Sequence, residues 1–273
     1  MDKQITNLIT HAINETSIEK GVAQIVNNKQ EGAGNFFVKT AGIVSGIDIV
    51  EKVFNIINPS LKVTIVKNNS DYVNRGDVIL SVKGRIIDIL KAQKVVINFL
   101  QLLSGVATIV DKYSEEIKDL DCKILSNYKG LPIINSLYFK AFEDGGGEAP
   151  SEYIKIDEYQ VMLAGSVTEA VHLVQKKYSY EDIEIYVKTK EEFEESLDLN
   201  VKRIILESTD DALIEECLQI KPNNIEFGVL GNFSIGRIRS LAKKGIKFII
   251  IDNISSQNKG IEVCFKLYKK SLI

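Results

Sequence analysis

Apolar and polar positions in the first hundred residues alternate between helical and β-strand patterns. Residues 5–13 and 46–54 carry apolar side chains at helical spacing. Residues 35–39, 61–66 and 77–84 form short β-like runs, and Gly and Asn punctuate the segments between them. The pattern predicts an α/β domain over residues 1–108, and we expect the C-terminal segment 256–273 to join it.

After Thr108 the pattern changes to apolar strands that alternate with helices of about ten residues. The expected strands are 123–125, 183–187, 203–206, 224–227 and 247–251. The clearest helices are 210–219 and 234–244, the latter with Ser234 as its N-cap. Such alternation favours a parallel sheet covered by helices. We therefore expect an α/β barrel over residues 109–255, with ligands at the carboxyl ends of its strands.

Composition excludes several classes of function. The 273 residues are 45% hydrophobic and 26% charged, which is typical of a globular protein. A net charge of −3 argues against nonspecific binding to nucleic acid. No run approaches the roughly 18 apolar residues of a membrane span, and the N-terminus lacks a signal-peptide pattern. Three widely spaced cysteines give no disulfide or zinc pattern, so we expect a cytoplasmic protein.

Residues 93–108 are the most informative segment of the chain. They resemble the signature helix of the quinolinate phosphoribosyltransferase family, also called nicotinate-nucleotide pyrophosphorylase (carboxylating). That family writes the segment as Glu-Arg-x-x-Leu-Asn-x-Leu-Gln-Arg-Leu-Ser-Gly-Ile-Ala-Thr. The uncharged frame is kept here, whereas Lys94 and Leu102 stand where the two arginines would be.

Other segments resemble the same family in the same order along the chain. They are 41–46, 74–79, the glycine run 145–147, 165–171 and the phosphate-loop-like 231–234. The resemblance implies a mixed α/β N-terminal domain packed on an open α/β barrel, usually in a homodimer. It also implies a transferase of pyridine nucleotide biosynthesis. Such an enzyme joins quinolinate to phosphoribosyl pyrophosphate with the help of Mg²⁺, and releases pyrophosphate and carbon dioxide.

The charged residues that the family uses to bind quinolinate are mostly absent. In residues 126–135, Lys129 is kept, but Tyr128 and Asn135 replace arginines. The family's Asn-His-Arg after the glycine run has no counterpart, because Gly147 is followed by Glu148. None of the five arginines falls on a base-binding position of the family. Because a buried dianion needs matched cations, loss of this set argues against quinolinate as the ligand.

The remaining candidates carry over from the resemblance residue by residue. Lys155 matches a family lysine in one alignment, whereas another alignment puts Asp157 there. Asp252 stands in the second phosphate loop, where it would repel phosphate. The predicted roles are Lys129 and Lys155 as catalytic residues, Lys94, Tyr128, Lys140, Gly231 and Asn232 as substrate-binding residues, and Glu207 and Glu226 as Mg²⁺ ligands. Solvated lysines, structural salt bridges and an ordinary turn are the alternative interpretations.

Three functions follow from these observations, and the sequence leaves open whether the chain is an enzyme. The first is a divergent phosphoribosyltransferase that binds or transfers a phosphoribosyl group with a ligand other than quinolinate. Tyr128 and Tyr159 would then contact a flatter, less charged ring. The second is a non-catalytic member of the family that serves as a binding or regulatory subunit. The third is the family's own quinolinate reaction.

Overall fold

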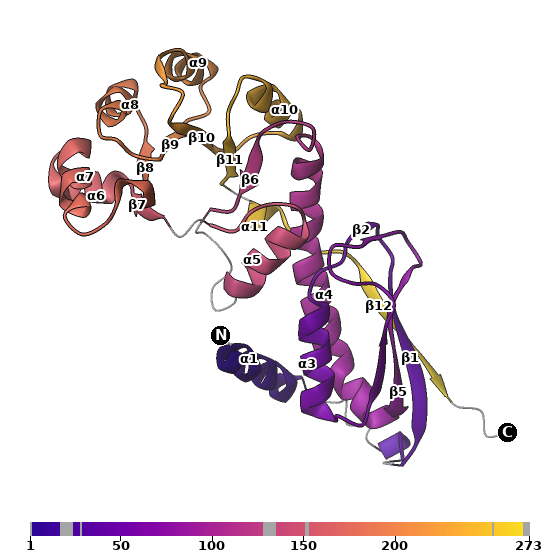
Figure 1. Ribbon diagram of the computed structural model, residues 1–273. Coiled ribbons are helices and arrows are strands. Elements are labelled where there is room, and N and C mark those ends of the chain that lie inside the picture. Colours follow the sequence, from indigo (N-terminus) through magenta and orange to yellow (C-terminus); the bar gives the residue numbers. More distant parts are fainter. Residues whose placement is uncertain are drawn as a thin grey trace. The chain divides into compact units, whose positions relative to one another are not determined.

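The chain forms two compact units, each described here by itself. The computed structural model describes residues 2–16, 24–27, 29–127, 135–150, 153–252 and 254–269 (Figure 1). Unit 1 comprises Met1–Asp111, Gly130–Gly146 and Ser255–Ile273, and unit 2 comprises Lys112–Lys129 and Gly147–Ile254.

The predicted domain boundaries differ from this division mainly at residues 130–146. That segment carries helix α5 (Asn135–Asp144) and belongs to unit 1 rather than to the barrel. Its contacts explain the placement. The buried Asp144 accepts a hydrogen bond from Ser45 Oγ at 2.7 Å. A Cβ on Gly145 would lie 2.3 Å from the carbonyl oxygen of Ala107, so only glycine lets the segment approach so closely.

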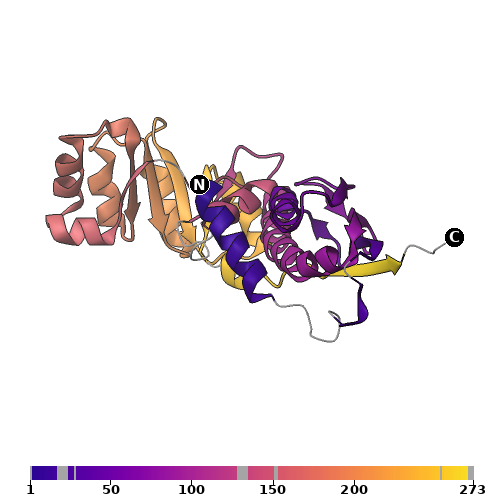
Figure 2. The same cartoon turned by 90° about the horizontal axis from the view of Figure 1, so that it is seen from below.

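Unit 1 is built on an antiparallel sheet with the strand order β12-β1-β5-β3. Figure 2 shows the yellow β12 strand at the edge of this sheet. The strands are β1 (Glu31–Val38), β3 (Lys62–Ile65), β5 (Val78–Arg85) and β12 (Val263–Lys269), and β2 (Gly42–Ile43) pairs separately with β4 (Tyr72–Val73). Side chains of β1 alternate in burial, as a strand with one covered face requires. Phe36 on its inner face meets Phe54 and Phe265, with ring centroids 6.2 and 4.7 Å away.

The helices of unit 1 supply the other half of its core. They are α1 (Asp2–Glu15), α3 (Ile47–Ile57), α4 (Ile86–Glu115) and α5, and the short α11 (Ile254–Gln257) begins at the boundary. α4 is the one described helix that is long and apolar enough to cross a membrane. Its most apolar stretch is 56% buried inside the protein, as expected of a core helix. Val96, Leu100 and Ala107 on this helix are fully buried.

Unit 2 contains a parallel sheet with the strand order β6-β11-β10-β9-β8-β7. Its strands are β6 (Lys123–Leu125), β7 (Ile154–Ile156), β8 (Ile183–Val187), β9 (Arg203–Glu207), β10 (Glu226–Gly231) and β11 (Phe248–Ile251). The crossovers carry α6 (Glu158–Ala164), α7 (Val167–Gln175), the 3₁₀ turn η1 (Tyr180–Asp182), α8 (Lys190–Leu197), α9 (Asp211–Ile220) and α10 (Ile235–Lys243). Among the described strands β6 and β7 are not paired with each other, so the barrel is open.

One face of the unit 2 sheet forms a continuous apolar core. Tyr186, Ile205, Leu230 and Ile250 belong to one buried cluster with Leu125 and Phe248. Figure 1 shows α7, α8, α9 and α10 on the outer side of the strands. Thr189 caps α8 with a reciprocal capping box, and the Asp210 side chain caps α9.

Most predicted elements of the barrel are confirmed, and one boundary is wrong in a way that matters for function. Strands at 123–125, 183–187, 203–206 and 247–251 are present, and Ser234 is the N-cap of α10. The strand predicted at 224–227 instead begins at Glu226 and ends at Gly231. Glu226 therefore lies at the amino end of its strand.

Candidate functional site at the carboxyl ends of the unit 2 strands

Polar side chains collect where the parallel strands of unit 2 end. Side chains alternate between the two faces of a strand, so Lys188 and Glu207 share the face of the buried Tyr186 and Ile205. The described polar residues at this edge are Asn127 after β6, Asp157 and Glu158 after β7, Lys188 after β8, Glu207 at the end of β9, and Asp252 after β11. Lys155 lies within β7, on the amino side of Asp157.

Both lysines of this edge contact carboxylates. Lys188 Nζ lies 2.5 Å from Glu158 Oε2 and 3.9 Å from Glu207 Oε2. The hydrogen bond to Glu158 is the main reason that the pKa of Lys188 is raised. Lys155 Nζ lies 3.5 Å from Asp157 Oδ2. Lys155 and Lys188 therefore share this edge with three carboxylates that they contact: Asp157, Glu158 and Glu207.

A hydrogen-bonded chain ties three neighbouring strand ends together. Asn127 Nδ2 donates to Asp252 Oδ1 at 3.1 Å and to the Asp252 carbonyl oxygen at 3.2 Å. The backbone N–H of Asp252 donates to the Gly231 carbonyl oxygen at 3.1 Å. These contacts hold the Asp252 carboxylate beside the ends of β6 and β10.

The loop after β10 leads directly into a helix N-terminus. A Cβ on Gly231 would lie 2.6 Å from Thr209 Cγ2, so this position has no room for a side chain. Asn232 is exposed, and Ser234 at the N-cap of α10 makes no side-chain capping bond. Backbone N–H groups in the first turn of a helix attract anions, so the predicted phosphate loop has suitable local geometry.

Glu207 and Glu226 do not share a site, and the prediction that both hold one Mg²⁺ ion does not fit the structure. Glu207 pairs in register with Leu230, whereas Glu226 pairs with Arg203, the first residue of β9. The two carboxylates therefore lie at opposite ends of strands, about 13 Å apart along the strand direction. Glu226 Oε2 accepts hydrogen bonds from Arg203 Nη2 at 3.0 Å and Nε at 3.2 Å. Among the described residues, no three His, Cys, Asp or Glu side chains cluster as metal ligands.

The remaining predicted ligands are spread over the chain. Lys140 belongs to unit 1, where its Nζ lies 2.7 Å from Asp144 Oδ1, and this hydrogen bond raises the pKa of Lys140. Lys94 is exposed on α4, and Tyr159 is exposed on α6. Tyr128 and Lys129 lie outside the described residues.

All five arginines of the chain lie in described segments, and four of them form ion pairs. Arg85 binds Asp88, Arg203 binds Glu184 and Glu226, Arg237 binds Asp211, and Arg239 binds Asp119. The fifth, Arg75, is exposed in the turn before β5. The arginine closest in sequence to the α10 N-terminus is Arg237, which also donates to the Thr209 carbonyl oxygen. None of these guanidinium groups is held at the inner edge of the sheet as a clamp for a ligand carboxylate.

The uncharged residues of segment 93–108 have packing roles in unit 1. Ser104 Oγ accepts the Ser45 backbone N–H at 2.9 Å, and Thr108 Oγ1 accepts the Ile43 N–H at 2.9 Å. A Cβ on Gly105 would lie 2.0 Å from Asn258 Oδ1 and 2.6 Å from Gly260 Cα. The part of the segment that the chain keeps is therefore the part that holds the fold together.

Sequence reasoning missed three residues of the site: Lys188, Tyr186 and Asn127. Lys188 and Tyr186 were visible as polar groups at alternate positions of an apolar strand, and they share its inner face. Asn127 gave no comparable signal, because its hydrogen bond joins it to a residue 125 positions away.

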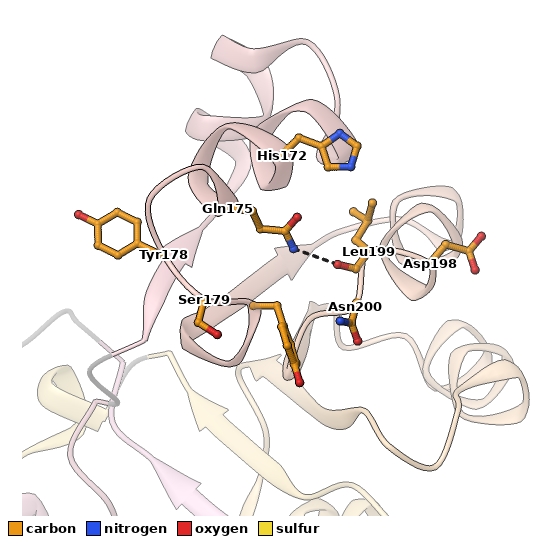
Figure 3. A pocket seen from close by; sticks show the side chains of 8 residues that line it. His172, Gln175, Tyr178, Ser179, Asp198, Leu199 and Asn200 are labelled. Atoms are coloured by element: carbon orange, nitrogen blue, oxygen red, sulfur yellow. Dashed lines mark hydrogen bonds between the residues drawn. The ribbon is translucent and has the colours of Figure 1, made fainter.

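A separate shallow groove of about 410 Å³ lies on the other side of unit 2. Its lining residues precede β8 and β9, so they belong to the amino ends of the strands: His172, Gln175, Tyr178, Ser179, Tyr180, Asp198, Leu199 and Asn200. Figure 3 shows Gln175 directed at Leu199, whose carbonyl oxygen accepts its amide hydrogen bond at 3.2 Å. The groove contains none of the predicted ligand residues.

Comparison with known proteins gives matches along almost the whole chain. Residues 8–104 match the family model described as "Quinolinate phosphoribosyl transferase, N-terminal domain", and residues 106–266 match the corresponding C-terminal domain. The chain is 25% identical to the chloroplastic nicotinate-nucleotide pyrophosphorylase [carboxylating] of Arabidopsis thaliana, over 85% of this chain and 73% of that protein.

Two bacterial comparisons cover even more of the sequence. A probable nicotinate-nucleotide pyrophosphorylase [carboxylating] of Bacillus subtilis is 22% identical, over 95% of this chain and 92% of its own. The crystal structure of NadC from Streptococcus pyogenes superposes with a TM-score of 0.91 at 21% identity, covering 99% of each chain. The two family models together span both units, and the chain belongs to the quinolinate phosphoribosyl transferase family.

Proposed function

We propose that this protein binds a phosphoribosyl group together with a ring ligand that carries less negative charge than quinolinate. Family membership supplies the phosphoribosyl part of the proposal. The proposed ring ligand differs from the substrate of the activity that the relatives are named for. This part of the proposal rests on which charged side chains of this chain are free to bind a ligand.

The main support for a less charged ring is that most arginines of this chain are already bound to its own carboxylates. A dicarboxylate is best held by bidentate guanidinium groups, and its burial without matched cations is unfavourable by several kcal/mol per charge. Here four arginines are engaged by Asp or Glu of the chain itself, and Arg75 is exposed in a turn. Lys188 is likewise paired with Glu158 at 2.5 Å. An uncharged or singly charged ring avoids the need for a second set of cations.

The phosphate end of the ligand has better support. Gly231, Asn232 and Ser234 form a tight turn at the α10 N-terminus, where backbone N–H groups favour phosphate. Glu207 remains available for a hydrated Mg²⁺, an ion that takes one or two carboxylates and completes its shell with water and phosphate. Lys155 would bind an anionic group of the ligand from inside the barrel. Lys94, Lys129, Lys140 and Tyr128 remain proposed contacts.

Calorimetric titration with phosphoribosyl pyrophosphate, with and without Mg²⁺, tests this function. The proposal predicts saturable binding that is stronger with Mg²⁺. A Glu207→Gln variant should lose the Mg²⁺ effect, and a Glu226→Gln variant should keep it, because Glu226 lies at the other end of its strand. Absence of binding at millimolar ligand in the wild-type protein would contradict the proposal.

A non-catalytic subunit is the second candidate, and the residues kept in the signature segment are consistent with it. The retained residues of the signature segment, Ser104, Gly105 and Thr108, all serve packing in unit 1. Their retention is therefore expected whether or not the chain is catalytic. Failure to bind phosphoribosyl pyrophosphate, together with stable co-purification of a second family member, would support this candidate.

A homodimer and a cytoplasmic location complete the proposal. Dimerisation follows from the family resemblance, and sedimentation velocity across a range of concentrations tests it. Burial raises the pKa of Cys122 to about 12 and that of Cys217 to about 11, so both thiols stay protonated at neutral pH. Buried, protonated thiols suit a reducing compartment, which fractionation of cells that express the tagged protein would test.

A further inference from the structure

Tyr186 lies on the inner face of the unit 2 sheet, on the strand next to the edge strand β7. It lies on the fully buried strand β8 and is 7% exposed, within the apolar cluster of the inner face. Lys155 on the neighbouring strand β7 places its Nζ 4.0 Å from the centre of the Tyr186 ring. An ammonium group over an aromatic face is attracted by the ring quadrupole, and more strongly where water is excluded.

The ring itself is held in place by a buried ionic network. The Tyr186 hydroxyl donates to Glu184 Oε1 at 2.7 Å. The other oxygen of Glu184 accepts from Arg203 Nη1 at 3.0 Å, and Arg203 is fixed on its far side by Glu226. The Glu184 and Arg203 side chains are only 2% and 7% exposed. A side chain anchored at both its ring and its hydroxyl cannot change rotamer without breaking this network.

We infer that Tyr186 is a positioning residue, which holds the Lys155 ammonium inside the barrel for an anionic group of the ligand. The aromatic ring at this position attracts the ammonium without carrying a charge of its own. Asp157 Oδ2 also contacts the Lys155 ammonium, at 3.5 Å, while its Oδ1 accepts the backbone N–H of Tyr159, so the ring and this carboxylate together hold the ammonium. The part of the inference that concerns the ligand rests on the proposed function.

Nuclear magnetic resonance of ¹³C-lysine-labelled protein tests the positioning without any ligand. Protons above an aromatic face are shifted upfield, so the Lys155 Hε resonance, assigned with Lys155→Arg, should be shifted and should show cross-peaks to the Tyr186 ring. Tyr186→Leu should abolish the upfield shift, and Tyr186→Phe should retain it. Tyr178→Leu is the matched control, since Tyr178 also carries a lysine over its ring, Lys177 at 5.3 Å, but lies in the groove at the amino ends of the strands.

Calorimetry with phosphoribosyl pyrophosphate then tests the role in binding. Tyr186→Leu should weaken binding about tenfold, and Tyr186→Phe should restore most of it. An unshifted Lys155 resonance in the wild-type protein would overturn the inference, even if Tyr186→Leu failed to fold. Unchanged affinity in a folded Tyr186→Leu variant would also overturn it. If the wild-type protein binds no phosphoribosyl pyrophosphate, the proposed function fails, while the resonance shift still decides whether Tyr186 positions Lys155.

Discussion

Gly105 on α4 lies so close to Asn258 that a Cβ on the glycine would fall 2.0 Å from the Asn258 Oδ1 atom. Asn258 is itself fixed, since its Nδ2 donates to the Leu102 carbonyl oxygen at 2.9 Å and its Oδ1 accepts the Gly260 N–H at 2.8 Å. The glycine of the signature segment thus joins the core helix to the C-terminal part of unit 1. Its role is architectural, which explains how it can persist while neighbouring arginines are lost.

Gly105→Ala should lower the free energy of unfolding by about 1–3 kcal/mol, because the backbone at Gly260 must move as well as the Asn258 side chain. Gly236→Ala is the matched control, since no atom lies within 4 Å of the added Cβ. That helical position should gain about 0.5–1 kcal/mol. Urea unfolding of both variants measures the difference, and equal effects would contradict the packing account.

Lys140→Met should destabilise unit 1 by about 1–2 kcal/mol, because the Asp144 side chain is 3% exposed and would lose its cation. Asp144 raises the pKa of Lys140, so the pair contributes stability below the unfolded lysine pKa of about 10.4 and loses it as pH rises through the folded value. The difference between wild type and variant should therefore shrink in alkaline solution. Lys94→Met, at an exposed position on α4, should change stability by less than about 0.5 kcal/mol. Equal losses in the two variants would argue that Lys140 has no structural partner.

Glu226→Gln should reduce stability by about 1–2 kcal/mol and leave phosphoribosyl pyrophosphate binding unchanged, since its carboxylate binds Arg203 at the amino end of the sheet. Glu207→Gln should leave stability nearly unchanged and remove the Mg²⁺ dependence of binding, because Glu207 is exposed at the carboxyl end and its ion pair among the described residues is a 3.9 Å contact with Lys188. Thermal unfolding and calorimetry on the same two preparations separate the two outcomes. Loss of Mg²⁺-dependent binding in the Glu226 variant would show that this assignment is wrong.

Asp119 should contribute to the fall in the free energy of unfolding as the pH becomes acidic. Arg239 donates two hydrogen bonds of 2.7 Å to this carboxylate and lowers its pKa to about 2. A depressed folded pKa means that the stabilisation is complete above the unfolded value of about 3.9 and disappears as pH falls through about 2. Asp119→Asn should therefore be less stable than wild type at pH 5, and the two should converge near pH 2. A constant difference from pH 5 to pH 2 would contradict this ionic origin.

The fold was predictable because the patterns that define it are local. Apolar runs located most of the barrel strands, and Ser234 marked the start of α10. The strand β10 was misplaced because the prediction began in the Asn223–Asn224 turn and stopped before Gly228, a residue type that usually ends a strand, whereas the strand runs from Glu226 to Gly231. Because of this shift, Glu226 lies at the amino end of its strand, away from the candidate site, instead of at the carboxyl end.

The site was less predictable because its partners come from distant parts of the sequence. The contact of Lys155 with Tyr186 joins different strands, and so does the bond from Asn127 to Asp252. Motif comparison detected the missing arginines, but it could not show that four of the five arginines present form ion pairs within the chain. Only the register of the parallel strands separated Glu207 from Glu226.

The most direct test of the central claim is calorimetric titration with two rings in the presence of saturating phosphoribosyl pyrophosphate and Mg²⁺. One ring is the dianion quinolinate, and the other is nicotinamide, an uncharged pyridine. The account predicts that nicotinamide binds more tightly than quinolinate, because the chain holds no arginine clamp for two carboxylates. Tighter, saturable binding of quinolinate would contradict it and would restore the family's own reaction as the function of this protein.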